Sequence, residues 1–223
     1  MPDPKIQRIL VWSRPLRIAH WLIALSVLVL LASGWSAGLN PVIAETAQDY
    51  HYIAGAVLIL ALALRLLLLF FGRGSDLLAD CETDRHRLTQ AGEMLRFYLS
   101  LGRSPLPRWY AHNPLWGPIY LLLFLFLLLQ ALSGVLLLKG VGLFAGLSLY
   151  GLHQLVSVII LGFTLLHLAA VFSHDAKGTG ADNSAMISGY RIFLIEDLKP
   201  DFGAPQVVPL EQLRRQLSDR DQG

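Results

Sequence analysis

The chain has 223 residues, of which 54% are hydrophobic and only 15% charged, whereas soluble domains carry about 25% charged residues. Its formal net charge of +2 is small and spread along the chain, which argues against nucleic acid as a partner. The lone cysteine, Cys81, excludes an internal disulfide, a CxxCH haem attachment site and a cysteine-ligated iron–sulfur cluster. These features predict a membrane protein.

Four apolar runs are each long enough to cross a bilayer, which takes about 20 residues in a helix. No small-residue cleavage site follows the first run, so it is predicted to be a retained span. The sequence therefore predicts an all-α membrane protein, with a four-helix transmembrane domain over residues 1–173 and a polar tail over 174–223. The predicted spans are residues 16–38, 50–71, 115–138 and 150–172.

Two polar segments flank the third and fourth spans. Within the connector 72–113, residues 84–101 place leucines and aromatics at helical spacing among charges, which predicts an amphipathic helix in the headgroup layer. Asn113 and Pro114 have the pattern of an N-cap followed by proline at the first helical position. The tail is predicted to be irregular, except for a helix around residues 210–217.

The basic residues predict the orientation of the spans. Of 18 Lys and Arg, four precede the middle of the first span, six lie in the connector and six in the tail. The loop after the first span has none, and the loop after the third has only Lys139. Because basic residues are retained on the inner side, both termini, the connector and the tail are predicted to be cytoplasmic.

Four histidines lie inside the predicted spans, and their depths match in pairs. His153 and His167 share the fourth span, and their positions in it separate the rings by about 21 Å in depth but only about 40° in azimuth. His20, near the inner end of the first span, is level with His167. His51, at the outer start of the second span, is level with His153.

Two imidazoles at each of two levels is the pattern required by two haems with bis-histidine ligation. Zinc or copper would need three or four ligands converging at one level. The cofactor is therefore predicted to be two haem b groups, held by His20 with His167 and by His51 with His153. The competing interpretations are that single histidines lie at the membrane interface and that the helices form an anchor without a cofactor.

His153 and His167 are 14 residues apart, and the same spacing of 14 residues separates His20 from Gly34 and His51 from Arg65. Gly34 is predicted to let the outer macrocycle approach the backbone, as glycine does where a ligand needs room. Arg65 is predicted to pair with a propionate of the inner haem, because an unpaired charge is costly in lipid. Its long side chain could instead extend to the inner membrane surface.

Several motifs occur in an order and spacing that resemble the membrane cytochrome b subunits of nickel–iron hydrogenases, within the bacterial cytochrome b561 group. They cover nearly the whole chain. They are RPLRIAHWL (14–22), HYIAG (51–55), HNPLW (112–116), LHQL (152–155) with its partner His167 on the same span, and NSAMISGYR (183–191).

The resemblance implies that His20, His51, His153 and His167 are the axial haem ligands of a multi-pass protein of the bacterial inner membrane. It also implies an electron-transfer subunit that anchors a periplasmic redox partner and links it to the quinone pool. That partner is hydrogenase-like, another dehydrogenase or a c-type cytochrome, because the loop after the first span and the residues before RPLR depart from the hydrogenase pattern. A homodimer is also compatible with the sequence.

Quinone is expected near the inner haem, at a site formed by the connector helix, His112 and His174. These two histidines lie outside the predicted spans, where a position in solvent or at the membrane interface is the simpler interpretation. The outer loops carry no nucleophile, base or metal constellation, so no substrate-converting centre is expected there. The alternative function is a stand-alone quinone-linked oxidoreductase that uses a small donor such as superoxide.

Overall fold

The computed structural model describes residues 6–77, 85–177 and 182–194. These residues belong to two compact units. The larger unit, Ile9–Arg191, contains every long helix, and the smaller one includes residues 6–8 and 192–194. The four predicted ligand histidines and all their contacts lie within the larger unit.

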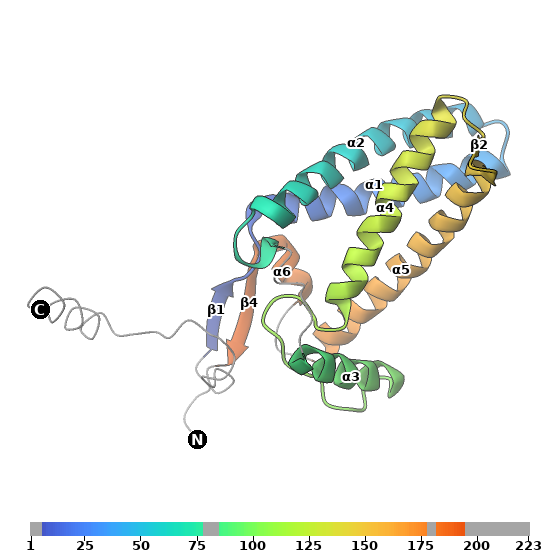
Figure 1. The fold of residues 1–223 in the computed structure, drawn as a ribbon. Coiled ribbons are helices and arrows are strands. Elements are labelled where there is room, and N and C mark those ends of the chain that lie inside the picture. The colour runs from blue at the N-terminus through green and yellow to red at the C-terminus, as the bar shows by residue number, and fades with distance from the viewer. Residues whose placement is uncertain (1–5, 78–84, 178–181, 195–223) are drawn as a thin grey trace, which may run out of the picture. The chain divides into compact units, whose positions relative to one another are not determined.

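Four helices are long and apolar enough to cross a membrane, as the sequence predicts. Helix α1 packs on α2, α4 packs on α5, and α2 also contacts α4. Each arises from a continuous apolar run, since a backbone in lipid must satisfy its hydrogen bonds within its own helix. The four helices are α1 (Arg14–Leu39), α2 (Ala44–Phe71), α4 (Trp116–Leu138) and α5 (Leu149–Lys177) (Figure 1).

Local sequence sets where these helices begin. The Ser13 hydroxyl accepts a hydrogen bond from the Leu16 N–H at 3.2 Å and caps α1. Before α4, the side-chain oxygen of Asn113 accepts from the Leu115 N–H at 3.0 Å. The predicted cap was wrong, because α4 begins at Trp116 with Leu115 at its N-cap position, so Asn113 and Pro114 both precede the helix. Helix α5 extends to Lys177, beyond the predicted end of the fourth span, and therefore includes His174.

A small apolar core joins all four long helices at mid-length. Its buried members include Val27 on α1, Leu58 on α2 and Ile160 on α5, and Leu127 of α4 packs in the same cluster. Val27, Leu58 and Ile160 each follow a histidine of the same helix by about two turns, which is about 10.5 Å of helix rise. The core therefore lies midway between the two levels of histidines.

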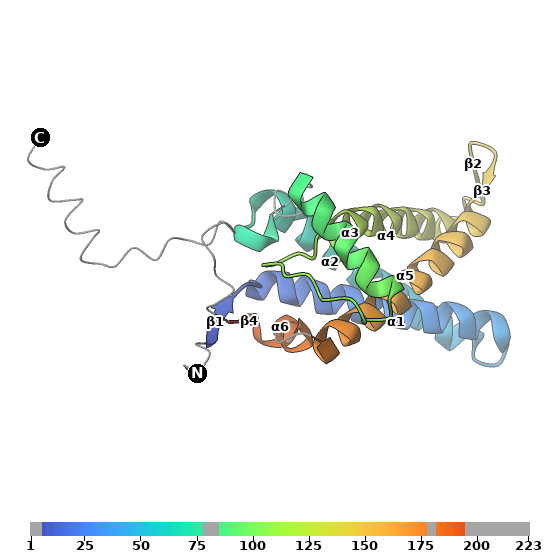
Figure 2. The same ribbon diagram turned by 90° about the horizontal axis from the view of Figure 1, so that it is seen from below.

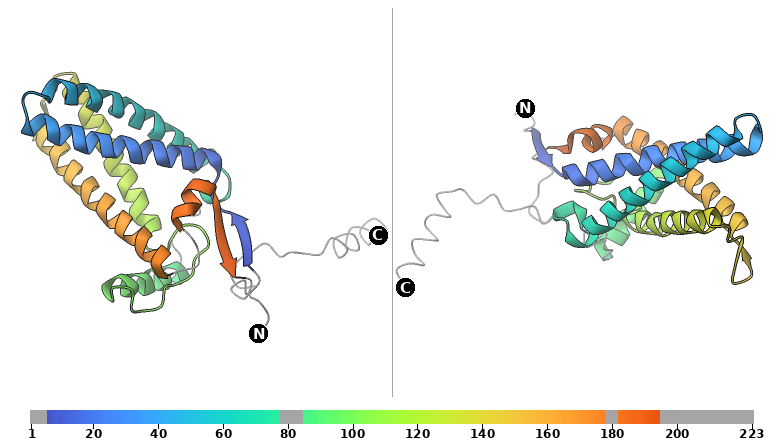
Figure 3. Two further views of the ribbon diagram at one scale, coloured as in Figure 1. Left: turned by 180° about the vertical axis from the view of Figure 1, so that it is seen from behind. Right: turned by 90° about the horizontal axis from the view of Figure 1, so that it is seen from above.

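One end of the bundle carries the short connections. Residues 40–43 join α1 to α2, and a two-stranded hairpin of β2 (Leu143–Phe144) and β3 (Leu147–Ser148) joins α4 to α5. Both connections lie at the same end of the bundle (Figures 1 and 3). Ala145 and Gly146 make the turn of the hairpin with positive φ angles of 50° and 81°.

At the opposite end, η1 (Gly74–Asp76) follows α2, and the predicted connector helix is α3 (Arg85–Leu99). Helix α3 crosses α4 and α5 near the start of α4 and the end of α5 (Figures 1 and 2). Its residues Met94 and Phe97 are buried, whereas Leu88 and Leu99 are exposed.

The segment after α5 contains regular structure that the sequence did not predict. Helix α6 (Asp182–Ser188) is followed by strand β4 (Tyr190–Leu194), which pairs with β1 (Ile6–Leu10). Between them, the Gly189 carbonyl accepts from the N–H groups of Val11 and Trp12 at 2.9 and 3.0 Å. Residues 210–217, where a tail helix was predicted, lie outside the described residues.

Candidate haem sites

Two of the four histidines face each other near the end that carries the short connections. His51 lies two turns into α2 and His153 one turn into α5, and their ring centres are 6.3 Å apart with an interplanar angle of 60°. We call them the loop-side pair. They come from two different helices, α2 and α5.

The other two histidines face each other near the opposite end. His20 of α1 and His167 of α5 also have ring centres 6.3 Å apart, with an interplanar angle of 62°. We call them the terminus-side pair. The sequence predicted both pairings from the depths of the histidines in spans of alternating direction, and all four rings are half-buried.

The separation of 6.3 Å between ring centres is the one that two axial ligands of one iron need. Two opposed imidazoles on a metal hold their ring centres about 6.2–6.4 Å apart, because each metal–nitrogen bond is about 2.0–2.1 Å and each nitrogen lies about 1.1 Å from its ring centre. Both pairs have this separation. The residues present therefore fit a bis-histidine haem at each level.

A serine holds each imidazole of the loop-side pair. The Ser33 hydroxyl of α1 lies 3.0 Å from Nδ1 of His51, and the Ser133 hydroxyl of α4 lies 2.9 Å from Nδ1 of His153. Both serines are buried, at 7% and 3% exposure.

A glycine follows each of these serines and makes room for the same ring. A Cβ on Gly34 would lie 3.4 Å from Cε1 of His51, and one on Gly134 would lie 3.3 Å from Cε1 of His153. Gly34, predicted to admit the macrocycle, thus lies against the imidazole itself. Larger side chains at either position would push the ring away from the helix backbone.

The terminus-side pair has aromatic surroundings instead. Phe163 stacks on His167 with ring centres 5.7 Å apart and an interplanar angle of 9°, and Trp116 and Tyr120 each lie 6.0 Å from the same ring. Trp21 packs edge-on against His20 at 5.6 Å. Within the described part of the chain, neither His20 nor His167 has a hydrogen bond from a ring nitrogen.

Arg65 is buried at 7% exposure, in the half of α2 that approaches the terminus-side pair. Its guanidinium donates to the carbonyl of Asp76 in η1 at 2.9 Å and lies 5.6 Å from the centre of the Phe124 ring. It is also close enough to His20 for the two side chains to interact electrostatically. The side chain therefore stays inside the protein, beside the predicted inner haem.

His112 and His174, the predicted quinone residues, are both buried rather than solvated. His112 packs edge-on against Trp12 at 5.0 Å, and Nε2 of His174 lies 2.6 Å from the Tyr98 hydroxyl. That hydroxyl also accepts from the Trp116 indole N–H at 2.7 Å. Trp116 thus links the His174 surroundings to His167.

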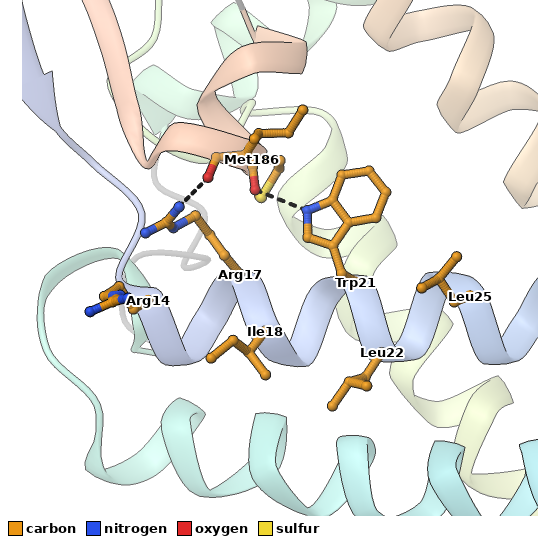
Figure 4. A pocket seen from close by; sticks show the side chains of 8 residues that line it. Arg14, Arg17, Ile18, Trp21, Leu22, Leu25 and Met186 are labelled. Atoms are coloured by element: carbon orange, nitrogen blue, oxygen red, sulfur yellow. Dashed lines mark hydrogen bonds between the residues drawn. The ribbon is translucent and has the colours of Figure 1, made fainter.

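An open groove of about 440 Å³ lies between the first half of α1 and α6 (Figure 4). Trp21 lines it and donates to the Met186 carbonyl at 3.0 Å, while Arg17 donates to the Ile187 carbonyl. Ile18, Leu22 and Leu25 form its apolar wall. Because Trp21 also contacts His20, the groove adjoins the terminus-side pair.

The model of one protein family, described as prokaryotic cytochrome b561, matches residues 11–189. The chain belongs to the prokaryotic cytochrome b561 family. This cytochrome is therefore a multi-pass membrane protein, and membership in a family of b-type cytochromes implies haem b and membrane electron transfer.

Two curated relatives agree with this assignment. A probable Ni/Fe-hydrogenase B-type cytochrome subunit of Cupriavidus necator is 25% identical over 213 residues, covering 82% of this chain and 86% of the relative. A probable Ni/Fe-hydrogenase B-type cytochrome subunit of Rhizobium leguminosarum bv. viciae is 28% identical over 217 residues, covering 84% and 90%. No solved structure matches. The resemblance to hydrogenase-type cytochromes is thus confirmed.

Apart from Gly34, the serine–glycine pairs are the part of the site that sequence analysis missed, because it gave no role at the histidines to Ser33, Ser133 or Gly134. A signal was present, because the same Ser-Gly dipeptide precedes His51 by 18 residues and His153 by 20. Each dipeptide lies near the end of one helix, and its histidine lies near the start of the next long helix.

Proposed function

We propose that this cytochrome carries two haem b groups, one between His51 and His153 and one between His20 and His167, and transfers electrons between a periplasmic redox partner and the quinone pool. Bound haem supplies one-electron redox chemistry. The observation that carries the proposal is the equal separation of 6.3 Å in both histidine pairs, on different helices and at two levels.

The chain itself would perform three tasks. Its four imidazoles would ligate the haem irons. Its apolar core of Val27, Leu58 and Ile160 would exclude water between the two histidine pairs. Arg65 supplies a buried positive charge beside the terminus-side pair, where a propionate is the natural counter-ion. Its hydrogen bond to the Asp76 carbonyl would hold the guanidinium in place for that role.

The distribution of Lys and Arg supports an orientation with both termini in the cytoplasm of a bacterial inner membrane. The loop-side pair would then lie near the periplasm, where a redox subunit docks. The names of the two relatives favour a hydrogenase as that subunit. Purification in mild detergent distinguishes this function from the stand-alone alternative: the first predicts a co-purifying periplasmic subunit, the second an isolated chain that turns over a small donor.

Quinone exchange is proposed at the terminus-side pair. His112 and His174 are buried among aromatic side chains, whereas the groove beside Trp21 has a volume typical of small-molecule pockets, about 300–1,000 Å³. The groove is therefore the better place for the quinone ring. Trp21→Leu is expected to raise the KM for a soluble quinone analogue several-fold, whereas His112→Ala leaves it unchanged; the reverse result would favour the buried histidines.

Haem content tests the two ligand pairs. The purified wild-type chain should contain two haem b per polypeptide. His51→Ala and His153→Ala should each lose one haem, and His20→Ala and His167→Ala should each lose the other, as judged by redox titration of the haem that remains. His86→Ala, at an exposed position of α3, is the matched control and should retain both. A colourless wild-type protein, or four variants that all retain two haems, would refute the assignment.

A further inference from the structure

The two loop-side imidazoles have the same hydrogen-bonding arrangement, built twice from different helices. Ser33 lies between Nδ1 of His51 and the Leu30 carbonyl, at 3.0 and 3.3 Å. Ser133 lies between Nδ1 of His153 and the Gln130 carbonyl, at 2.9 and 3.1 Å. In both cases the carbonyl belongs to the residue three positions before the serine.

This arrangement fixes which ring nitrogen carries the proton. A serine hydroxyl has one hydrogen to donate, and a backbone carbonyl can only accept. The hydroxyl hydrogen therefore goes to the carbonyl, and the oxygen of the serine accepts from Nδ1–H of the imidazole. Nε2 is left with its lone pair, which is the form that a metal ligand needs.

The same relay changes the donor strength of the ring. An imidazole that donates its free N–H to an acceptor becomes a more basic metal ligand. A more basic ligand stabilises ferric over ferrous iron and so lowers the reduction potential. The terminus-side rings lack such a bond among the described residues, and the buried charge of Arg65 beside His20 favours the reduced, less positive state.

We propose that Ser33 and Ser133 are positioning residues that set the tautomer and donor strength of His51 and His153, so that the loop-side haem has the lower reduction potential of the two. This inference rests on the proposed function. The difference in reduction potential would favour electron transfer from the loop-side haem to the terminus-side haem. The glycine after each serine allows the ring to approach closely enough for the bond.

Redox titration of the purified full-length protein tests the proposal. His167→Ala leaves only the loop-side haem and therefore identifies its midpoint potential in the wild type. Ser33→Ala and Ser133→Ala should each raise that lower potential. The expected effect is up to a tenfold rise in the reduced-to-oxidised ratio at a fixed potential, which is about 59 mV for a one-electron couple. The higher potential should not move.

The conservative variants separate the hydroxyl from packing. Ser33→Thr and Ser133→Thr keep the hydroxyl and should retain the wild-type potential. Ser36→Ala is the matched control, since this hydroxyl donates only to the Ala32 carbonyl of its own helix, and it should change nothing. If the Ala variants leave the lower potential unchanged, shift the higher one, or behave like the Thr variants, the proposal is overturned. A wild-type protein with fewer than two haems would instead refute the proposed function.

Discussion

The two histidine pairs have the same separation but different surroundings. The loop-side pair is held by hydrogen bonds between its ring nitrogens and buried serines, with glycines beside the rings. The terminus-side pair is held by aromatic packing, with a buried arginine nearby. Ligand identity alone would make the two sites equivalent. The comparison teaches that one fold can surround two chemically equal histidine pairs with different neighbours, and the proposed difference in reduction potential rests on that contrast.

Gly134→Leu should give the largest effect and should act on one pair only. The space for a Cβ at this position is already limited by the His153 ring at 3.3 Å, so a branched side chain must displace the imidazole. We expect the haem content to fall from two to one per chain, with the terminus-side haem retained. Pyridine haemochrome quantification measures the loss.

Gly162→Leu on α5 is the control, because nothing lies within 4 Å of a Cβ built there. It should keep both haems. If Gly134→Leu kept both haems, the glycine would not be needed beside the His153 ring. The glycines could then no longer be counted among the differences that matter between the two pairs.

Arg65→Leu should act on the other pair, with an intermediate effect. It removes the positive charge beside His20 and leaves the Asp76 carbonyl without its buried donor, which costs about 1–3 kcal/mol of stability. Loss of the charge should lower the potential of the terminus-side haem, with each tenfold change in its equilibrium corresponding to about 59 mV.

Arg65→Lys keeps the charge and is expected to retain most of the wild-type potential. If both haems titrate unchanged in Arg65→Leu, the arginine serves only to bridge α2 and η1. Thermal unfolding followed by haem absorbance would then show the stability loss without any shift in potential.

The spans could be predicted from the length of the apolar runs, and the pairings from the depth of each histidine in spans that alternate in direction. The sequence positions of His153 and His167 on α5 put the two rings on one face, whatever packs around them. The aromatic contacts of His174 could not be predicted in this way. They depend on where α3 crosses α5, and no local pattern reports how distant elements pack. The residues around His174 are polar, so the sequence pattern indicates that the fourth span ends before them. In the structure α5 continues through these residues to Lys177, and His174 contacts Tyr98 and Trp109.

The hydrogen bonds of Ser33 and Ser133 to the histidines had a local sequence signal, but a serine in a membrane helix has a more common explanation. A serine in a membrane helix usually bonds to its own backbone or to a neighbouring helix. Ser33 does both, since it donates to the Leu30 carbonyl and lies within hydrogen-bond distance of Nδ1 of His51. Only the repetition of the arrangement at Ser133 and His153 distinguishes a ligand support from ordinary helix packing.

Phe163→Leu should give the smallest effect, because it changes ring orientation more than ligation. Phe163 stacks on His167 from one turn earlier in α5, and an aromatic contact of this kind is worth about 0.5–1.5 kcal/mol. Without it, the His167 ring can turn about its axial bond while its nitrogen stays in place. We expect altered ferric EPR g-values for the terminus-side haem, an unchanged loop-side signal and two haems per chain. Phe172→Leu, exposed on the same helix, should leave both signals as they are. A change in the loop-side signal instead would mean that the two levels are coupled through α5, and the contrast between the pairs could not then be assigned to their separate neighbours.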